Sequence, residues 1–345
     1  SGGMNASDDV LGTLLSVPPP VLAEPTLLAH LAAGWGLAGE LVPLTSERDL
    51  NHRLDTADGR FLAKITNPAE AAEMTDFQTR AFLHVAAVAP GVPVPRLIPA
   101  RTGAPWRDTP AGRLRLFTWL AGDPLHAVPR SLALARASGV ALAQLTAALA
   151  GFSHPADDHV ILWDIRQFSR LAPLLPVLSD PGTRDAAEAA LARFATAVAP
   201  RLADLPSQVC HADFNPWNLL VDADRQRIAG IVDFGDMVRT PRICDLAVAA
   251  SYQIDPAAPL ASLAAFVAGY HGVLPLLPEE TELLFDLIVA HMITTLVIAG
   301  WRAARYPENA DYILRNTPSA RAGLAAFRAL GPMAVTRCLA EGAEG

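Results

Sequence analysis

The chain has 345 residues, 51% of them hydrophobic and 18% charged, which suits one large domain or two ordinary ones and argues against disorder. A formal net charge of −8 argues against a protein whose main task is to bind nucleic acid or an anionic membrane. Cys210, Cys244 and Cys338 are scattered and lack metal-binding spacing, so we expect no disulfide framework, no zinc site and a cytoplasmic location.

The start of the chain predicts a tag followed by a short helix. Ser1-Gly2-Gly3 before Met4 is typical of an expression scar, so residues 1–9 are expected to be a tag and flexible start. No positively charged, apolar leader follows. "EPTLLAHLAAGWGL" then predicts a short helix that ends at glycine.

The next hundred residues predict a small sheet with one helix in its middle. Two strand-like runs flank "TADG", where Asp58-Gly59 indicates a β-hairpin. Residues 67–88 predict a helix, with Asn67 as its cap and Pro68 in its first turn. "VPVPRLIPA" is expected to be extended, and "RLRLFTWLAG" to be another strand pair.

After Gly122 the pattern becomes mainly helical. Helices are predicted over residues 131–149, 183–205, 259–274 and 279–306, with two short β-like runs between residues 209 and 233. The apolar run Leu283 to Trp301 contains Asp286 and His291. A buried helix is therefore favoured over a membrane span.

Two acidic motifs lie in this second part. "CHADFNPWNLL" contains His211-x-Asp213-x4-Asn218, and Asp233-Phe234-Gly235 begins twenty residues after Asp213. A kinase catalytic loop has the pattern H-R-D-x-x-x-x-N and is followed by D-F-G. The spacing from Asp to Asn and the order of the motifs are the same here.

The residue types suit phosphoryl transfer. An aspartate such as Asp213 can orient the attacking hydroxyl and accept its proton. Asn218 and Asp233 offer the hard oxygen ligands that Mg²⁺ prefers. The segment between the motifs, "LLVD…RQRIAGIVD", predicts a hairpin that brings them together.

The same residues allow two other interpretations. A metallohydrolase using His211 and Asp213 would need further clustered histidines, which the sequence lacks. A catalytically inactive nucleotide-binding module of the same fold is the main alternative. The joint presence of Lys64, Asp213, Asn218 and Asp233 favours the enzyme.

Taken together, "HADFNPWNLLVD" and "IAGIVDFGDMVRTPRICDLAVA" resemble the two signature blocks of the aminoglycoside phosphotransferase and choline kinase group. "SERDLNHRL", "LRLFTWLAGDPL", "LWDI" and "WRAARYPEN" are most similar to its hydroxylysine kinase-like branch. The resemblance implies an α+β, bilobal protein-kinase-like fold. Its parts would be a nucleotide-binding lobe over residues 1–117 with a small antiparallel sheet, a hinge at 118–122 and a larger, mainly helical lobe over 123–345.

The resemblance also implies nucleotide contacts. Lys64 would contact the phosphates, and the backbone of Thr118 and Leu120 would bind the adenine edge. His211 is expected to brace the catalytic loop. "TSERDLNH" replaces a glycine-rich loop, so Ser46 or Arg48 is expected to touch the phosphates.

The acidic partner of Lys64 is left open. Glu73 and Asp76 are candidates, and Gln78 stands in the usual glutamate position. Glu70 is closer to the predicted start of the helix, where its charge favours the helix dipole.

The acceptor is expected to be small. Ala212 replaces the arginine that docks an activating phosphosite, and no long segment follows Asp233 that could support a protein substrate. Asp236 and Asp164 are candidate ligands for an amine. Arg302 and Arg305 could hold a carboxylate, with His291 and Trp301 as further candidates for contact, each with a simpler explanation as core. Asp245 is expected to cap the next helix.

The prediction is therefore a small-molecule kinase that uses Mg²⁺ and transfers the γ-phosphate of ATP or GTP. The hydroxyl acceptor would be a small amine or amino acid, of the hydroxylysine, homoserine, choline or aminoglycoside type. No nucleic acid or membrane partner is expected, and the sequence does not indicate an oligomeric state.

Overall fold

The N-terminal part of the chain forms one antiparallel sheet. The computed structural model describes residues 17–343, so the expected tag and flexible start over residues 1–9 lie outside it. The strand order is β1 (Gly39–Leu44), β2 (Leu50–Thr56), β3 (Gly59–Thr66), β6 (Gly112–Thr118) and β4 (Leu97–Ile98), with β5 (Arg107–Thr109) paired to β6. Thr56 pairs with Gly59, whose φ of 132° suits glycine, and this confirms the predicted hairpin.

One predicted strand pair is wrong. Residues 113–122 were expected to form two strands, but β6 is a single strand that ends at Thr118. Its partners are β3, β4 and the preceding β5, so no turn is needed inside the segment. The next residues leave the sheet and lead into the second lobe.

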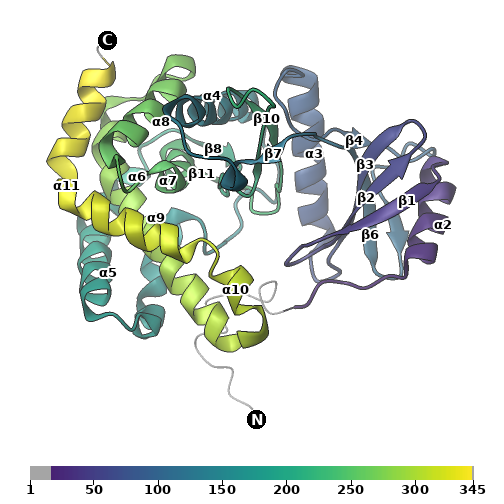
Figure 1. Ribbon diagram of the computed structural model, residues 1–345, viewed down its shortest axis with the longest axis horizontal. Helices are drawn as coiled ribbons and strands as arrows, with labels where there is room; N and C mark the ends of the chain where they lie inside the picture. The colour runs from purple at the N-terminus through teal and green to yellow at the C-terminus, as the bar shows by residue number, and fades with distance from the viewer. Residues whose placement is uncertain (1–16, 344–345) are drawn as a thin grey trace.

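Two helices accompany the sheet, α2 (Glu24–Trp35) and α3 (Ala72–Val88). The expected end of the first helix at glycine is confirmed, because Gly36 adopts φ 67° and donates to the carbonyl of Ala32. The predicted start of the second helix at Asn67 is wrong. Asn67 accepts a bond from the Ala69 amide and donates to the carbonyl of Arg48, so it closes a turn before α3. In Figure 1, α3 lies between the sheet and the helical lobe, and α2 lies on the far side of the sheet.

The second lobe is mainly helical. Its α-helices are α4 (Leu132–Leu149), α5 (Pro181–Arg193), α6 (Ala199–Leu202), α7 (Arg242–Gln253), α8 (Pro259–Val273), α9 (Pro278–Arg305), α10 (Ala310–Ile313) and α11 (Thr317–Ala343), the last broken at Gly331. Three 3₁₀ segments, η2 (Leu125–Ala127), η3 (Ile165–Val177) and η5 (Pro307–Asn309), and the π-helical η4 (Phe194–Val198) connect them. The single helix predicted over residues 183–205 is therefore interrupted. Pro200 has no N–H to continue the α-helical bonding there.

Five short strands support the predicted motifs, where the sequence indicated two. β9 (Leu219–Val221) lies between β7 (Asp123–Pro124) and β10 (Ile228–Ile231), while β8 (Ser207–Cys210) pairs with β11 (Val238–Pro241). The predicted hairpin is confirmed as β9–β10. It places residues 211–218, called the catalytic loop below, beside residues 232–236.

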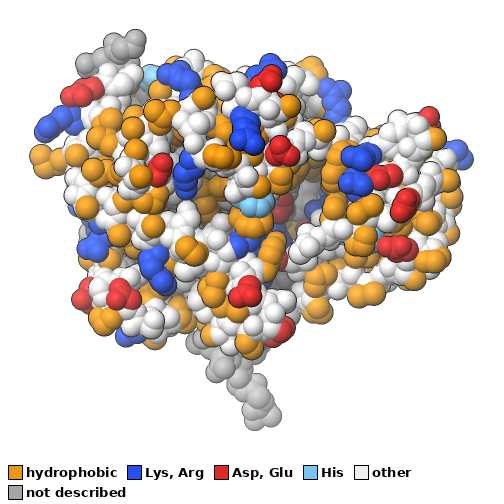
Figure 2. All heavy atoms as spheres, viewed as in Figure 1, with side chains coloured by type: hydrophobic (Ala, Val, Ile, Leu, Met, Phe, Trp, Pro, Cys, Tyr) orange, Lys and Arg blue, Asp and Glu red, His pale blue; other side chains and the backbone are white. Residues whose placement is uncertain are grey.

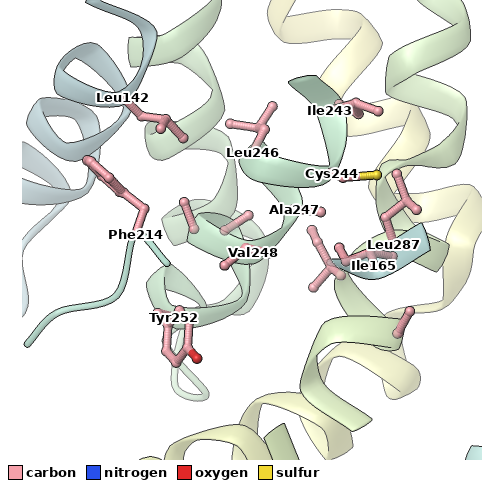
Figure 3. Packing of buried hydrophobic residues seen from close by; sticks show 14 of the residues in the cluster. Leu142, Ile165, Phe214, Ile243, Cys244, Leu246, Ala247, Val248, Tyr252 and Leu287 are labelled. Carbon is pink, nitrogen blue, oxygen red and sulfur yellow. The ribbon is translucent and has the colours of Figure 1, made fainter. Parts of the chain in front are cut away.

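Two described helices, α4 and α9, are long and apolar enough to cross a membrane by length and composition. In α9, 89% of the most apolar window is buried inside the protein, as expected for the central helix of a folded core. Figure 3 shows the neighbouring α7, whose Leu246, Ala247 and Val248 point into the same apolar cluster.

Close packing of α4 against α8 depends on glycine. A Cβ on Gly269 would lie 2.1 Å from the Arg136 carbonyl oxygen of α4, whereas a Cβ on Gly272, in the next turn of α8, would meet nothing within 4 Å. The two helices can approach this closely only where the facing residue lacks a side chain.

We expect Gly269→Ala to lower the free energy of unfolding by about 1–3 kcal/mol, because backbone must shift to make room. The matched Gly272→Ala should leave it unchanged or raise it by up to about 1 kcal/mol through helix propensity. Urea denaturation of both variants measures the difference. Equal effects would contradict the packing argument.

Candidate active site

The catalytic loop holds the carboxylate of Asp213 by both of its oxygens. The side-chain amide of Asn215 donates to Oδ1 over 2.8 Å, and that of Asn218 donates to Oδ2 over 3.0 Å. Asn218 also donates to the backbone carbonyl of Asp213. The carboxylate is thereby fixed in position at the surface of the cleft, as a base that must meet one hydroxyl group requires.

His211 braces the loop and has no free nitrogen. Its Nε2 donates to the Val232 carbonyl over 2.9 Å, and its Nδ1 accepts the Asp213 amide over 3.2 Å. These partners fix the neutral ring, and burial lowers the pKa of His211. A metal-ligand role for this histidine, as in a metallohydrolase, is excluded because both nitrogens are in use.

Asp245 of α7 holds the catalytic loop through a hydrogen bond to its backbone. Ala212 adopts φ 66°, a left-handed conformation that costs energy for a residue with a Cβ, and its amide donates to Asp245 Oδ1 over 2.9 Å. Asp245 lies in the first turn of α7, which begins at Arg242, so the expected helix-capping role is wrong. Burial raises the pKa of Asp245 to about 7.

Phe214 of the catalytic loop and Phe234 of the second motif are buried and pack against the hydrophobic core. Phe214 is fully buried and points into the helical cluster beside Leu142 of α4 (Figure 3). Phe234 packs on the ring of His211 and on Phe82 of α3, with ring centroids 4.7 and 4.6 Å apart. The second motif therefore touches both lobes.

Asp233 lies opposite the catalytic loop. It also adopts a left-handed backbone, φ 58°, and its Oδ1 accepts the amide of Gly235. The adjacent Val232 amide donates to the carbonyl of Asn218 over 2.9 Å, which ties the two motifs together. Asp233 therefore follows a residue bonded directly to Asn218, and their shared cation stays a prediction.

The loop between β1 and β2 reaches across the cleft. Arg48, at 2.9 Å from Asp236, forms an ion pair between the lobes, and Ser46 accepts the amide of Asp49. Glu47 pairs with Arg302 and Arg315 of the helical lobe. Figure 2 shows the hollow between the lobes, with acidic and basic side chains along it.

The partner of Lys64 differs from every predicted candidate. Its Nζ lies 3.2 Å from Asp49, a residue of the same loop. Asp76 instead pairs with Arg80 and His154, and Glu73 is exposed.

The remaining candidate partner of Lys64, Gln78, belongs to a separate network. Gln78 donates to Glu70 and accepts a bond from Arg115. Arg115 is itself fully buried. The Gln78 side chain is thus occupied by Glu70 and Arg115 and does not pair with Lys64.

The charges at the cleft perturb one another. Burial raises the pKa of Asp213 well above its usual value, and the Asp236 and Asp233 carboxylates raise it further. Burial also opposes ionisation of Asp233, but Lys64 and Arg48 outweigh it and hold the pKa of Asp233 below its usual value. The site thus contains an ionised carboxylate at Asp233 and a more basic one at Asp213.

The donor set fits a magnesium ion. Within residues 17–343 no three His, Cys, Asp or Glu side chains are grouped to hold a metal. Mg²⁺ commonly takes only one or two protein ligands and completes its shell with phosphates and water. Because the amide nitrogen of Asn218 faces Asp213, its oxygen points away from that carboxylate. Asn218 and Asp233 can therefore offer one amide and one carboxylate oxygen.

The two residues predicted to bind the adenine edge, Thr118 and Leu120, have different surroundings. The Thr118 amide donates to the Arg96 carbonyl and its hydroxyl accepts the Arg96 amide, so its N–H is not free for an adenine. Leu120 lies outside the sheet, close to Gly230 of β10. Its backbone stays the predicted adenine contact.

One prediction about the acceptor is wrong. Asp164 is buried beneath η3, where it bonds Arg166 and the hydroxyl of Thr240, so it stabilises the lobe and does not face the cleft. Arg302 pairs with Glu47, and Arg305 lies over the ring of Trp301, so both have protein contacts and their carboxylate role stays a prediction.

His291 is a core residue. It is buried and contacts the hydroxyl of Tyr252, and burial lowers its pKa to about 4. A neutral ring in an apolar helix is the simpler of the two explanations that the sequence allowed.

Three residues of the site were missed in the sequence. Asn215 was visible in the motif, but nothing in its spacing indicated a bond to Asp213. Asp49 and Glu47 lie in an irregular loop, whose contacts come from tertiary structure.

A two-lobed fold with a paired Asp and Asn on one loop and an Asp on the next defines a kinase-like phosphotransferase. The model of the phosphotransferase enzyme family matches residues 40–284, more than half of the chain. The chain belongs to this family, and it is a phosphotransferase that acts on small molecules.

Relatives of known activity are hydroxylysine kinases. That of Mus musculus is 26% identical over 327 residues, covering 86% of each chain. That of Danio rerio is 27% identical over 302 residues, covering 81% of this chain and 84% of its own.

Solved structures share the fold. A microcompartment-associated aminopropanol kinase superposes with a TM-score of 0.63 at 18% identity, covering 90% of this chain and 99% of its own. An amicoumacin kinase, in complex with AMP-PNP and Ca²⁺, gives 0.62 at 12% identity, covering 86% and 95%. These likenesses confirm the protein-kinase-like fold.

Asp245 generates a prediction about stability. Its folded pKa of about 7 lies above the ordinary 3.8, so the folded state keeps a proton that the unfolded state loses as the pH rises from about 4 to 7. Stability from this group is therefore present at low pH and lost across that range.

Asn at this position still accepts the Ala212 amide but does not titrate. We expect the free energy of unfolding of Asp245→Asn, relative to the unchanged protein, to rise by a few kcal/mol, at most about 4, between about pH 4 and pH 7. Urea denaturation across this range, with the exposed Asp224→Asn as control, measures it. Parallel curves for Asp245→Asn and the unchanged protein would contradict the burial argument.

Proposed function

We propose that this chain transfers the γ-phosphate of ATP or GTP, with Mg²⁺, to a hydroxyl group of a small amine or amino acid. The observation with most weight is the carboxylate of Asp213, held by Asn215 and Asn218 opposite Asp233. The hydroxylysine kinase relatives, which match over most of their length, support a hydroxylated amino acid as the acceptor. The aminopropanol kinase supports an amino alcohol less directly, through the fold alone.

In this proposal, Asp213 accepts the proton of the acceptor hydroxyl as its oxygen bonds to the γ-phosphorus and the bond to the nucleoside diphosphate breaks. Its raised pKa makes it a stronger base than an exposed aspartate. Asn215 and Asn218 keep the carboxylate oriented while the proton moves. His211 keeps the loop in shape and does not take part in proton transfer.

The donor is bound from the other lobe. Lys64 and Arg48 place positive charge next to Asp233, where the phosphates would lie. Mg²⁺, when bound, would neutralise charge on the phosphates, and Asn218 and Asp233 would hold it. Retention of all these groups supports an enzyme over an inactive nucleotide-binding module.

The direct test is nucleotide turnover with Mg²⁺ and either ATP or GTP. The acceptor panel would contain hydroxylysine, homoserine, aminopropanol, choline and an aminoglycoside. Diphosphate release that depends on one amine-bearing class is the expected result. Turnover with none of these acceptors, but with a hydroxyl compound lacking an amine, would overturn the proposed acceptor class.

Asp213→Asn should lower kcat by about 10²–10⁴-fold, because the general base is lost. Nucleotide binding, measured by calorimetry, should change little. Asp233→Asn should instead weaken Mg²⁺–nucleotide binding. The exposed Asp224→Asn is the neutral control. Full turnover by Asp213→Asn would mean that the base is another group.

The pH dependence of kcat tests the electrostatics. Arg48 lowers the pKa of Asp213 and Asp236 raises it. Loss of the cation in Arg48→Gln should therefore move the acid limb of the profile to higher pH, and loss of the anion in Asp236→Asn should move it to lower pH. Shifts in the same direction, or none, would show that Asp213 does not set this limb.

A further inference from the structure

A cavity of about 480 Å³ lies beside the catalytic loop in the helical lobe. Its walls come from the segment after β7, the starts of α4 and α8, the end of α7 and the chain around the start of α11. Pro216 and Trp217 of the catalytic loop form one side. The volume lies in the range of small-molecule sites.

The cavity begins close to the proposed base. Pro216 directly follows Asn215, whose side chain holds Asp213. Tyr252 lines the cavity, and after burial the charge of Asp213 is the largest influence that raises its pKa. The cavity therefore adjoins the loop that carries Asp213, and an acceptor bound in it would extend its hydroxyl toward that loop.

Positive charge dominates the lining. Arg130 and Arg315 are its two arginines, and Asp255 is its one carboxylate. Arg130 donates only to the carbonyls of Tyr252 and Gln253, at 3.4 and 3.3 Å, and no carboxylate of the described residues lies within 4.0 Å of it.

Arg315 is also incompletely neutralised. It shares the single carboxylate of Glu47 with Arg302, so two guanidinium groups meet one acid. Its guanidinium lies 5.3 Å from the ring centre of Trp217, which keeps it at the cavity wall. A carboxylate arriving here would find charge that the protein does not itself satisfy.

The aromatic wall adds a second feature. The rings of His126 and Trp217 stack with centroids 3.5 Å apart and an angle of 15°. Burial lowers the pKa of His126, and Arg315 lowers it further, so the ring is neutral at neutral pH. The pair presents a flat surface on which a short methylene chain can lie.

These charges discriminate between acceptors. A polycation such as an aminoglycoside would be repelled by two arginines, and choline has no anion to meet them. An amino acid has one carboxylate for the arginines and an ammonium group for Asp255. The lining is thus complementary to a zwitterion.

We propose that this cavity binds the carboxylate end of an amino-acid acceptor through Arg130 and Arg315, and that it makes the enzyme prefer the amino acid to the amine that lacks only this carboxylate. The inference rests on the proposed function, since it concerns the acceptor of that same reaction. Arg130 is the specificity residue, because Arg315 also joins the two lobes.

The test compares hydroxylysine with its decarboxylated diamino alcohol in Arg130→Gln. Loss of one charge-assisted hydrogen bond should raise the KM for hydroxylysine by about 10–100-fold. The KM for the diamino alcohol should stay within about twofold, which also shows that the variant is folded. Arg136→Gln, an exposed arginine of α4 outside the lining, is the matched control, and Arg130→Lys should recover part of the preference.

Equilibrium binding separates this inference from the proposed function. Calorimetry with Mg²⁺ and AMP-PNP should show tighter binding of hydroxylysine than of the diamino alcohol, and Arg130→Gln should abolish the difference. Selective binding without turnover would uphold the inference and overturn the proposed function. Turnover with equal loss on both acceptors in Arg130→Gln, or no binding of hydroxylysine, would overturn the inference. If Arg130 only stabilised the end of α7 through the carbonyls of Tyr252 and Gln253, both acceptors would lose turnover equally.

Discussion

The site depends on one buried hydrogen bond, from the Ala212 amide to the carboxylate of Asp245. Ala212 holds an unfavourable left-handed backbone, and without a strong acceptor below it the chain would relax toward ordinary extended geometry. This bend directs Asp213 to the cleft and His211 into the core. Because Asp245 is itself fixed in α7, which is buried from Ile243 to Gln253, the core of the helical lobe positions Asp213.

The proximity of the two acidic motifs could be predicted from sequence because their residues are close along the chain. Asp213 and Asn218 are one loop apart, and β9 and β10 join that loop to Asp233. The helices and the first hairpin follow from periodicity and turn residues in the same way. The partner of Lys64 could not be predicted, since Asp49 lies in an irregular loop and the helix offered acidic residues in plausible places. The prediction that Asp164 faces the acceptor was wrong for a related reason. The sequence does not show that Arg166 and Thr240 already donate hydrogen bonds to this carboxylate.

Polar contacts join the two lobes on the cleft side. The loop before β2 uses Glu47 to hold Arg302 and Arg315, and Arg48 to hold Asp236. One short loop therefore contacts Lys64 through Asp49 and the cavity wall at Arg315 through Glu47. Through Arg48 it also contacts Asp236, whose charge acts on Asp213. Under the proposed function, binding at either substrate site would change the charge that this loop meets, and the two sites would be electrostatically linked.

The segment after Asp233 has a consequence for control of the enzyme. Residues 238–241 form β11, are paired along their length with β8, and continue directly into α7. A segment bonded into a sheet at one end and a helix at the other cannot swing out and back as a gate. The β11–α7 segment is therefore a fixed wall beside the site, and a gate of that kind is not built into this part of the chain.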